Sequence, residues 1–403
     1  MPKPRFHLFG HTVAVRLPRW RPSAAGVRWA LSVAAALLLG AAIGPIAASA
    51  QQARPSGTAQ PDPSGPSGPA GPRPGFPHLR HIFVIMMENT SSSDLLSPSN
   101  PDTRYIQQLA ATGGLATDYY GVTHTSLPNY IAATSGQTWG SNNDDDAQAP
   151  LFNHENIVDQ FEAAHVSWKA YMQSLPFPGD TVDTTPDGLY VRKHDPFLLY
   201  PDVYNDPARA RNVVPLDQLA TDLAANRVPD FAWITPNVCD DMHGGASACP
   251  YPSSPSSPQQ ATLYQDGNAF LEKWVGLITS SRAWRQGSSA IFITWDEGSY
   301  NDTSPFQPLD DRGGPDSPIL PATPANPATG GGGDLAGGTV YGGGLVPMIV
   351  VASDVHGHRT DATSADHYSL LRTIEENFGL PLLGDAGDSV QVHSLAPLLQ
   401  PGR

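Results

Sequence analysis

Four short apolar runs set the strongest limit on how this chain can fold. They are HIFVIMM at residues 81–87, DFAWIT at 230–235, AIFITW at 290–295 and VPMIVVA at 346–352. Continuous apolar runs of this length are typical of parallel strands that are buried on both faces of a sheet. Helical patterns lie between them, at residues 103–111, 127–135, 155–165, 215–225, 261–281 and 366–378. Strands that alternate with helices predict an α/β fold, a three-layer sandwich with a mostly parallel central sheet.

Two stretches of low complexity divide the chain. Residues 51–77 are dominated by Pro, Gly, Ser and Ala, which cannot bury enough apolar surface to offset the entropy of ordering, so we expect a disordered linker. Residues 303–338 are rich in Pro, Gly and Asp but interrupt a foldable region, which predicts a surface loop that forms a lid beside the site. We therefore expect one folded domain at residues 78–403.

The beginning of the chain carries an export pattern. Residues 29–50 are apolar, follow a basic segment and end in Ala48-Ser49-Ala50, which suits a signal peptidase. We expect residues 1–50 to be a signal peptide that is cleaved after Ala50, so that the protein is secreted. The alternative is an uncleaved membrane anchor, because about 20 apolar residues can span a bilayer. Cys239 and Cys249 are the chain's two cysteines, and an oxidising compartment favours a disulfide over two buried thiols.

The charge of the chain excludes one class of partner. The formal net charge is −15, and six of the 23 basic residues lie before residue 51, where no acidic residue occurs. The exported part is therefore more acidic than the whole chain. Binding of nucleic acid or of an anionic membrane relies on Lys and Arg, so we expect neither as a partner of the folded domain.

Polar residues follow three of the apolar runs directly. Glu88-Asn89 follows the first run and Asp296-Glu297 the third, and the second is followed by Asn237, Asp240, Asp241 and His243. Ligands bind at the carboxyl ends of parallel strands, so these oxygen donors are expected to converge on one site. Any single pair could instead be a helix cap or a solvated turn, but their shared position favours a metal site.

Ser126 lies at the predicted start of a helix, in the segment Thr123-His124-Thr125-Ser126-Leu127-Pro128. Its simplest role is to cap that helix. A helix N-terminus also offers free N–H groups and a positive dipole end, which suit a phosphoryl oxygen, and a metal beside the serine would favour its alkoxide. Ser126 is therefore a candidate nucleophile as well as a cap.

Five segments resemble the phosphoesterase family that contains bacterial secreted acid phosphatases and phospholipases C, within the alkaline phosphatase superfamily. The segments occur in the family's order between residues 80 and 381, and they are HIFVIMMENTSSSDLL, THTSLPNYIAATSG, TPNVCDDMHG, FITWDEG and DHYSLLRTIEENFGLP. The resemblance implies an alkaline-phosphatase-like sandwich and a phosphoesterase catalytic domain at residues 78–403.

The resemblance also implies roles for individual residues. It assigns Ser126 as nucleophile and places His243 and His367 near the phosphate or a second metal. The residue after Asn89 is commonly basic or histidine in relatives, whereas this chain has Thr90. The implied metal ligands are Glu88, Asn89, Asp296 and Glu297.

Two further segments, SWKAYM and YVRKHDPF, resemble parts of the family that face the substrate. The implied substrate-binding residues are Lys169, Tyr171, Lys193 and His194, together with Asn129 of the serine segment. A cationic donor can hold phosphate oxygens, although a lone lysine is more often solvated. The acidic run at residues 144–146 lacks the spacing of a calcium loop, so we expect a solvated loop there.

Together these features predict a metal-dependent phosphoric ester hydrolase that acts through a phosphoserine on Ser126. His243 or His367 would protonate the leaving alcohol. An oxygen ligand shell favours Ca²⁺, Mg²⁺ or Mn²⁺, and participation of the histidines favours Zn²⁺ or iron. The expected partner is a small-molecule or lipid phosphate ester, cleaved by an acid-phosphatase-type phosphomonoesterase, with phosphoinositides among the candidates. The alternatives are a phospholipase C type phosphodiesterase and an inactive surface binding protein on the same fold.

Overall fold

A computed structural model of the chain describes residues 76–141, 143–144, 152–254, 256–301, 304–308, 313–317 and 342–400. They all belong to one compact unit, residues 64–403. The expected signal peptide, nearly all of the linker and most of the loop at 303–338 lie outside the described residues. Within the described ranges, no helix has the length and apolar character that a membrane crossing needs.

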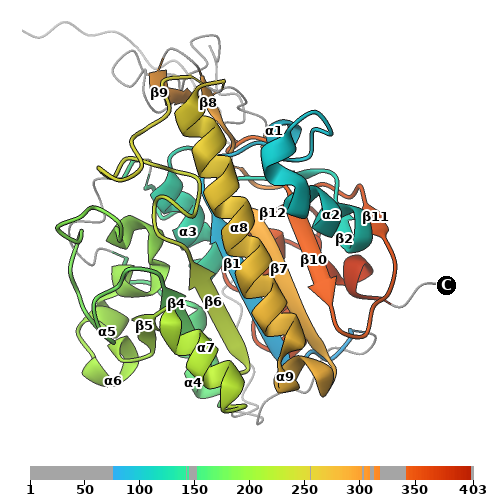
Figure 1. Ribbon diagram of the computed structural model, residues 1–403. Coiled ribbons are helices and arrows are strands. Elements are labelled where there is room, and N and C mark those ends of the chain that lie inside the picture. Colours follow the sequence, from blue (N-terminus) through green and yellow to red (C-terminus); the bar gives the residue numbers. More distant parts are fainter. Residues whose placement is uncertain are drawn as a thin grey trace, which may run out of the picture. The chain divides into compact units, whose positions relative to one another are not determined.

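The centre of the domain is an eight-stranded sheet (Figure 1). Its order is β11-β2-β10-β7-β1-β6-β4-β5, and every strand except β10 runs in the same direction. The strands are β1 (His81–Met87), β2 (Gly114–Ala116), β4 (Trp168–Met172), β5 (Val213–Pro215), β6 (Phe231–Thr235), β7 (Ser289–Trp295), β10 (Met348–Ala352) and β11 (Arg359–Asp361). The prediction of a mostly parallel α/β sheet is confirmed.

One of the four predicted parallel strands was assigned the wrong direction. The run at residues 346–352 forms β10, which pairs antiparallel with both β7 and β2. An apolar run reports burial, and a central strand is buried whichever way it points, so the pattern could not show the direction. The carboxyl end of β10 consequently lies away from the ends of β1, β6 and β7.

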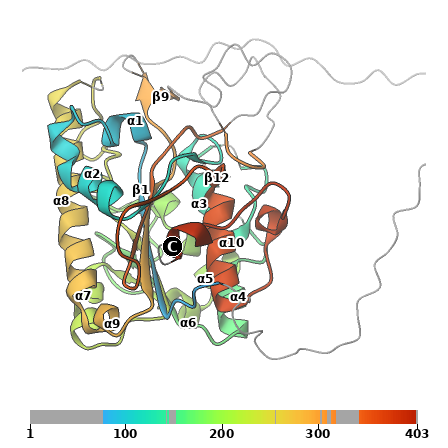
Figure 2. The ribbon, with the colours of Figure 1, turned by 90° about the vertical axis from the view of Figure 1, so that its right-hand side faces the viewer.

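Helices cover both faces of the sheet and complete the three layers. Figure 2 shows α2, α7, α8 and α9 on one side of the sheet and α3, α4 and α10 on the other. The helices are α1 (Ser92–Leu95), α2 (Arg104–Thr112), α3 (Ser126–Ser135), α4 (Ile157–Ala163), α5 (Pro201–Tyr204), α6 (Pro207–Ala210), α7 (Asp217–Ala224), α8 (Pro258–Ser280), α9 (Arg282–Arg285) and α10 (His367–Phe378). Each of the six predicted helices is present with small shifts at its ends.

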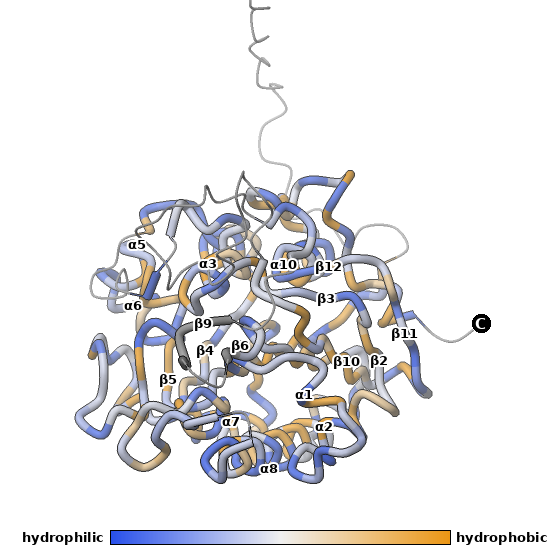
Figure 3. The backbone as a smooth tube through the Cα atoms, turned by 90° about the horizontal axis from the view of Figure 1, so that it is seen from above, coloured by the Kyte–Doolittle hydropathy of each residue, from blue (hydrophilic) through white to orange (hydrophobic). Residues whose placement is uncertain are grey.

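Two small sheets lie outside the main one. β3 (Tyr119–Tyr120) pairs with β12 (Ala365–Asp366), and β8 (Tyr300–Asn301) pairs with β9 (Ser304–Pro308). The second pair falls partly in the stretch expected to be a loop, so the described part of that stretch contains a strand. Figure 3 shows apolar residues along the inner segments of the domain and polar residues along the outer side of helices such as α8.

The central strand β1 fixes where the core lies. Its residues from Ile82 to Met87 are fully buried, because β6 and β7 flank it and helices cover both faces. β7 is buried along its whole length in the same way. This explains why both strands read as unbroken apolar runs.

Helix α3 ends at Gly136, which has a positive φ of 78°. A Cβ atom built on Gly136 would lie 2.2 Å from the carbonyl oxygen of Leu383, so the helix end packs directly on the backbone of another segment. Gly140 also has a positive φ, of 80°, but a Cβ atom there would meet nothing within 4 Å. A comparison of substitutions at the two positions therefore distinguishes the cost of a left-handed backbone from the cost of steric overlap.

We expect Gly136→Ala to lower the free energy of unfolding by about 3 kcal/mol, because it adds overlap to left-handed strain, and Gly140→Ala to lower it by only about 1 kcal/mol. Urea unfolding followed by circular dichroism measures both. Equal losses in the two variants would show that the contact with Leu383 does not matter.

Candidate functional site

Three strand ends meet at one edge of the sheet. β1 lies between β6 and β7, so the segments that leave these strands are neighbours. The backbone N–H of Glu88 donates to the carbonyl of Asp241 at 2.9 Å, and that of Asp296 donates to the carbonyl of Met87 at 2.9 Å. The backbone N–H of Asn89 donates to Oδ1 of Asp296 at 3.0 Å. The polar residues that follow these strands therefore lie together, as expected from the sequence.

Ser126 is the first residue of α3 and points into this cluster. Its side chain is 1% exposed. Its hydroxyl donates to Oε2 of Glu88 at 2.9 Å and lies 3.3 Å from Oε1 of Glu297. Thr125, rather than Ser126, occupies the N-cap position of the helix. Ser126 therefore does not serve as the cap.

Four buried carboxylates surround the serine: Glu88, Asp241, Asp296 and Glu297 are all 0% exposed. Burial, and then the nearby charges of Asp296 and Asp241, hold the pKa of Glu88 well above its usual range. Burial, followed by the charge of Glu297, raises the pKa of Asp296 to about 8. Burial likewise holds the pKa of Asp241 high. Four buried carboxylates so close together are stable only when some of them are protonated or when a cation binds among them.

Glu88, His194 and His243 could share one metal ion, because a donor atom of each lies within 4.8 Å of those of the other two. Nδ1 of His243 donates to the carbonyl of Gly244 at 2.7 Å, which leaves the lone pair of Nε2 facing the cluster. A histidine that ligates a metal usually has its other nitrogen fixed in this way. Burial, and then Lys193, lower the pKa of His243 to about 3, so the ring is neutral.

Several buried polar atoms beside Ser126 make no hydrogen bond within the described part of the chain. The two ring nitrogens of His194 lie 3.3 Å from oxygens of Glu88 and Asp241, but without hydrogen-bond geometry. These unpaired atoms are Asn89 Oδ1, His194 Nδ1 and Nε2, Asp241 Oδ2 and Asp296 Oδ2. Unpaired buried acceptors are costly, so this set fits a cation with mixed oxygen and nitrogen ligands.

Lys193 is the cation that the protein itself brings to the cluster. Its Nζ donates to Oδ2 of Asp144 at 2.8 Å and lies 3.4 Å from Nε2 of His243. Burial alone would lower the pKa of Lys193, but Asp144 and Glu88 raise it above the usual range. Asp144 also accepts from the backbone N–H of Leu127 at 3.1 Å, so the expectation of a solvated loop is wrong for this residue. Residues 145 and 146 lie outside the described ranges.

His367 does not fit the expected role of a general acid. Its Nε2 donates to the carbonyl of Asp296 at 2.6 Å, and its Nδ1 accepts from the hydroxyl of Tyr119 at 2.9 Å. Burial lowers its pKa to about 4. Both nitrogens are occupied, so His367 positions the chain at Asp296, and its ring proton is held by the Asp296 carbonyl.

Asn129 is likewise a structural residue. Its Oδ1 accepts from the backbone N–H groups of Val122 and Thr123, and its Nδ2 donates to the carbonyls of Thr123 and Thr125. The side chain is fully buried and holds the segment that leads to Ser126. The expectation that Asn129 binds substrate is corrected accordingly.

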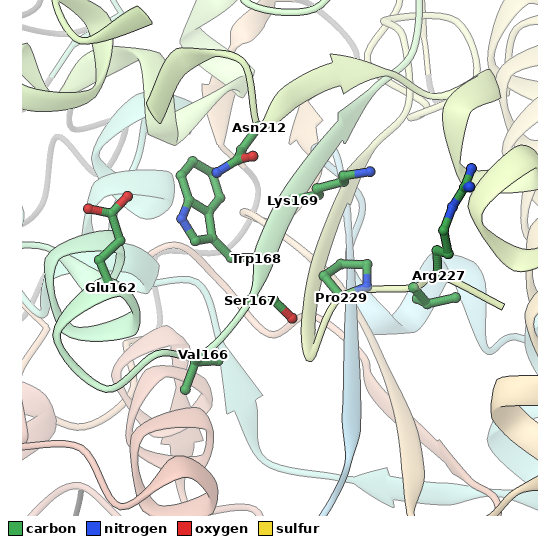
Figure 4. A pocket seen from close by; sticks show the side chains of 9 residues that line it. Glu162, Val166, Ser167, Trp168, Lys169, Asn212, Arg227 and Pro229 are labelled. Carbon is green, nitrogen blue, oxygen red and sulfur yellow. The ribbon is translucent and has the colours of Figure 1, made fainter. Parts of the chain in front are cut away.

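Lys169 and Tyr171 are not part of the cluster. Both are on β4 and point to the same side, where Lys169 Nζ and the Tyr171 hydroxyl donate to Oδ2 of Asp222 at 2.6 and 2.9 Å. Lys169 also lines a pocket of ≈ 440 Å³ with Trp168 and Arg227 (Figure 4). The pocket lies where β4 and β6 begin, whereas the cluster lies where the strands end. Their predicted contact with substrate is therefore corrected.

Two residues of the cluster were not predicted as site residues. His124 is fully buried and its Nδ1 pairs with Oε2 of Glu297. Tyr130 donates from its hydroxyl to Oε1 of Glu88 at 2.5 Å. His124 lies two residues before Ser126 and Tyr130 one helical turn after it, so proximity to the candidate nucleophile was the available signal. Asp241 was noted among the strand-end residues but was not assigned as a ligand.

The raised pKa of Asp296 makes the stability of the metal-free protein depend on pH. Between the ordinary value of 3.8 and about 8, the folded state holds a proton that the unfolded chain releases. Stability should therefore fall by about 1.4 kcal/mol per pH unit as the pH rises through that window. Unfolding of chelator-treated protein between pH 5 and 8 measures the slope, and Asp296→Asn should make it shallower, because Glu88 and Asp241, whose pKa values are also raised, still contribute. A stability that rises with pH would contradict the assignment.

Comparisons with known proteins agree with the segments quoted above. The chain is 27% identical over 316 residues to an acid phosphatase of Aspergillus fumigatus, which covers 76% of this chain and 57% of that protein. It is 25% identical over 224 residues to a phosphatidylinositol-3-phosphatase of Mycobacterium tuberculosis, covering 55% of this chain and 64% of that one. The matches to three fungal acid phosphatases cover about three quarters of this chain. They cover less than three fifths of the length of each of those phosphatases.

A solved structure from Vibrio parahaemolyticus, described as a protein in the alkaline phosphatase superfamily, is 11% identical with a TM-score of 0.43. The match covers 78% of this chain and 71% of that one. A model of the Phosphoesterase family matches residues 97–381, which is more than half of the chain. The chain belongs to the Phosphoesterase family.

Proposed function

We propose that the protein hydrolyses phosphate monoesters through a phosphoserine formed on Ser126. The observation that carries this proposal is the position of Ser126, whose hydroxyl lies at the first turn of α3 and bonds to the Glu88 carboxylate. Membership of the Phosphoesterase family and similarity to acid phosphatases support the same chemistry. The buried serine and the carboxylates beside it argue against the alternative of an inactive binding protein on the same fold.

The first step forms a bond between Oγ of Ser126 and phosphorus and breaks the bond between phosphorus and the leaving alcohol. The proton of the hydroxyl passes to Glu88, which already accepts its hydrogen bond, and the leaving alcohol takes a proton from solvent. Water then breaks the bond between Oγ and phosphorus, which yields inorganic phosphate and restores the serine.

A divalent cation fits the buried donor atoms beside the serine, of which those of His194, Asp241, Asn89 and Asp296 include atoms without a hydrogen bond in the described part of the chain. Glu88, His194 and His243 would hold it, with Asp241 as a further donor. Asn89 and Asp296 offer the remaining unpaired oxygens, next to the serine. When bound, the cation lowers the pKa of the serine hydroxyl and neutralises the phosphoryl charge. Two imidazoles in the set favour Zn²⁺ or iron over Ca²⁺ and Mg²⁺.

Lys193 is the group best placed to stabilise the developing charge. It is a partly buried ammonium that Asp144 already fixes, so it costs little reorganisation when the phosphate arrives. This role replaces the expected proton transfer from His243 or His367, because the ring proton of His243 is held by Gly244 and both nitrogens of His367 are occupied.

We further propose that the enzyme acts outside the cytoplasm, where the Cys239–Cys249 disulfide can form, and amino-terminal sequencing of the recovered protein would check this.

We expect Ser126→Ala to lower kcat for p-nitrophenyl phosphate by about 10³-fold or more, because no other nucleophile replaces the hydroxyl. Ser135→Ala, at the other end of the same helix, is the matched control and should keep most activity. Acid quenching of the wild-type enzyme should trap phosphate on the peptide that contains Ser126. Full activity of Ser126→Ala would refute the nucleophile assignment.

We expect His243→Ala and Glu88→Gln to weaken binding of Zn²⁺ or Mn²⁺ by at least about tenfold, since each removes a ligand atom. Titration of the metal into chelator-treated protein, with the rise in Tm as a second readout, measures the affinity. His358→Ala removes an exposed histidine and serves as the control. If Glu88→Gln, Asn89→Ala and Asp296→Asn weakened binding while His243→Ala did not, the oxygen-only ligand set expected from the sequence would be correct.

A further inference from the structure

Gln173 lies outside the cluster around Ser126 but is bonded to a segment that supplies part of it. It directly follows β4, and its backbone N–H donates to the carbonyl of Thr235, the last residue of β6, at 3.0 Å. Its side-chain Oε1 accepts from the backbone N–H of Asn237 at 3.1 Å, and its Nε2 donates to Oδ2 of Asp240 at 2.5 Å. Both ends of the amide group therefore bind the turn that follows β6.

The same turn leads into two of the candidate metal ligands, Asp241 and His243. Oδ1 of Asn237 accepts from the backbone N–H of Asp240 at 3.0 Å, and the carbonyl of Asn237 accepts from that of Asp241 at 2.8 Å. The carbonyl of Asp241 accepts from the backbone N–H of Glu88 at 2.9 Å, and its Oδ1 accepts from that of His243 at 2.7 Å. A continuous network of hydrogen bonds therefore joins the glutamine amide to three candidate ligands.

The partners of Gln173 require a neutral amide at this position. One partner is a backbone donor and the other is a carboxylate, and a primary amide offers an acceptor to the first and a donor to the second. A carboxylate in its place would face Oδ2 of Asp240, and two such oxygens repel each other. An apolar side chain would remove both bonds, so the turn after β6 would lose its connection to the end of β4.

We propose that Gln173 is a positioning residue of the metal site, which fixes the turn that places Asp241 and His243 beside Glu88. This inference rests on the proposed function, because it concerns the ligands named there. Oδ2 of Asp241 makes no hydrogen bond in the described part of the chain, so its position depends on the backbone of the turn. Loss of the Gln173 amide therefore displaces donor atoms of the site without removing any of them.

The test measures binding of Co²⁺, as a substitute for Zn²⁺, to the full chain after chelator treatment. Gln173→Met keeps the length of the side chain without its hydrogen bonds, and it should weaken Co²⁺ binding by about tenfold. Gln173→Glu keeps the acceptor but sets a carboxylate against Asp240, so it should weaken binding at least as much. Either variant alone is sufficient for the test if the other fails to fold.

Gln218→Met is the matched control. Nε2 of Gln218 also donates to an aspartate, Oδ1 of Asp222 at 3.1 Å, and both of these residues belong to α7, away from the cluster. This variant also loses one amide–carboxylate hydrogen bond, but it should keep the affinity of wild type for Co²⁺. Equal losses of affinity in Gln173→Met and Gln218→Met would show a general effect of stability and would overturn the positioning role.

The absorption spectrum of bound Co²⁺ adds a readout that general destabilisation does not change. Its visible bands depend on the number and arrangement of the ligands, so they report the geometry of the site without turnover. At saturating Co²⁺ the bands should differ from those of wild type in Gln173→Met but not in Gln218→Met. Wild-type bands and affinity in Gln173→Met and Gln173→Glu would overturn the inference.

The same measurements separate this inference from the proposed function. If wild type bound Co²⁺ with the expected losses in the Gln173 variants but formed no phosphoserine, the proposed function alone would be refuted. If wild type formed a phosphoserine and the Gln173 variants bound Co²⁺ as wild type does, the positioning role alone would be refuted. Failure of wild type to bind Co²⁺ would overturn the metal site and with it the role of Gln173.

Discussion

The structure depends on bringing four carboxylates together in a place that water does not reach. Glu88, Asp241, Asp296 and Glu297 are fully buried, and Lys193 is the cation that faces them among the described residues of the site. Like charges at this separation destabilise a fold unless protons or a cation neutralise them. The packing of the sheet therefore holds together a charge arrangement that is favourable only when protons or a bound cation neutralise it.

The scaffold meets this demand with a rigid frame. The carboxylates leave three adjacent central strands, whose register is fixed by ladders along their fully buried length. The groups that touch them are themselves held from outside the site. His367 fixes the carbonyl of Asp296, Asn129 closes the turn before Ser126, and the disulfide closes the segment that carries His243. Rigid support of this kind keeps repelling groups in place before a metal binds.

The sequence was enough to predict the layers, the convergence of the strand ends and the position of Ser126 at the start of a helix, because burial and periodicity leave direct traces in residue order. It could not give the direction of β10, since burial is the same in either direction. It also placed Lys169 and Tyr171 in the site, because the segment SWKAYM resembles a part of the family that faces the substrate. Side chains at alternate positions share one face, and here that face turns to Asp222 on α7 rather than to the strand ends.

The remaining errors share a cause that concerns hydrogen bonds. A buried histidine or asparagine has the same letter in the sequence whether it binds a ligand or supports the backbone. Asn129 and His367 have every polar atom of the side chain paired inside the protein, so they are positioning residues. His194 and Asn89 keep buried atoms unpaired. Since folded proteins pair nearly all buried polar groups, the clustering of such atoms beside Ser126 marks this place as the one where a ligand belongs.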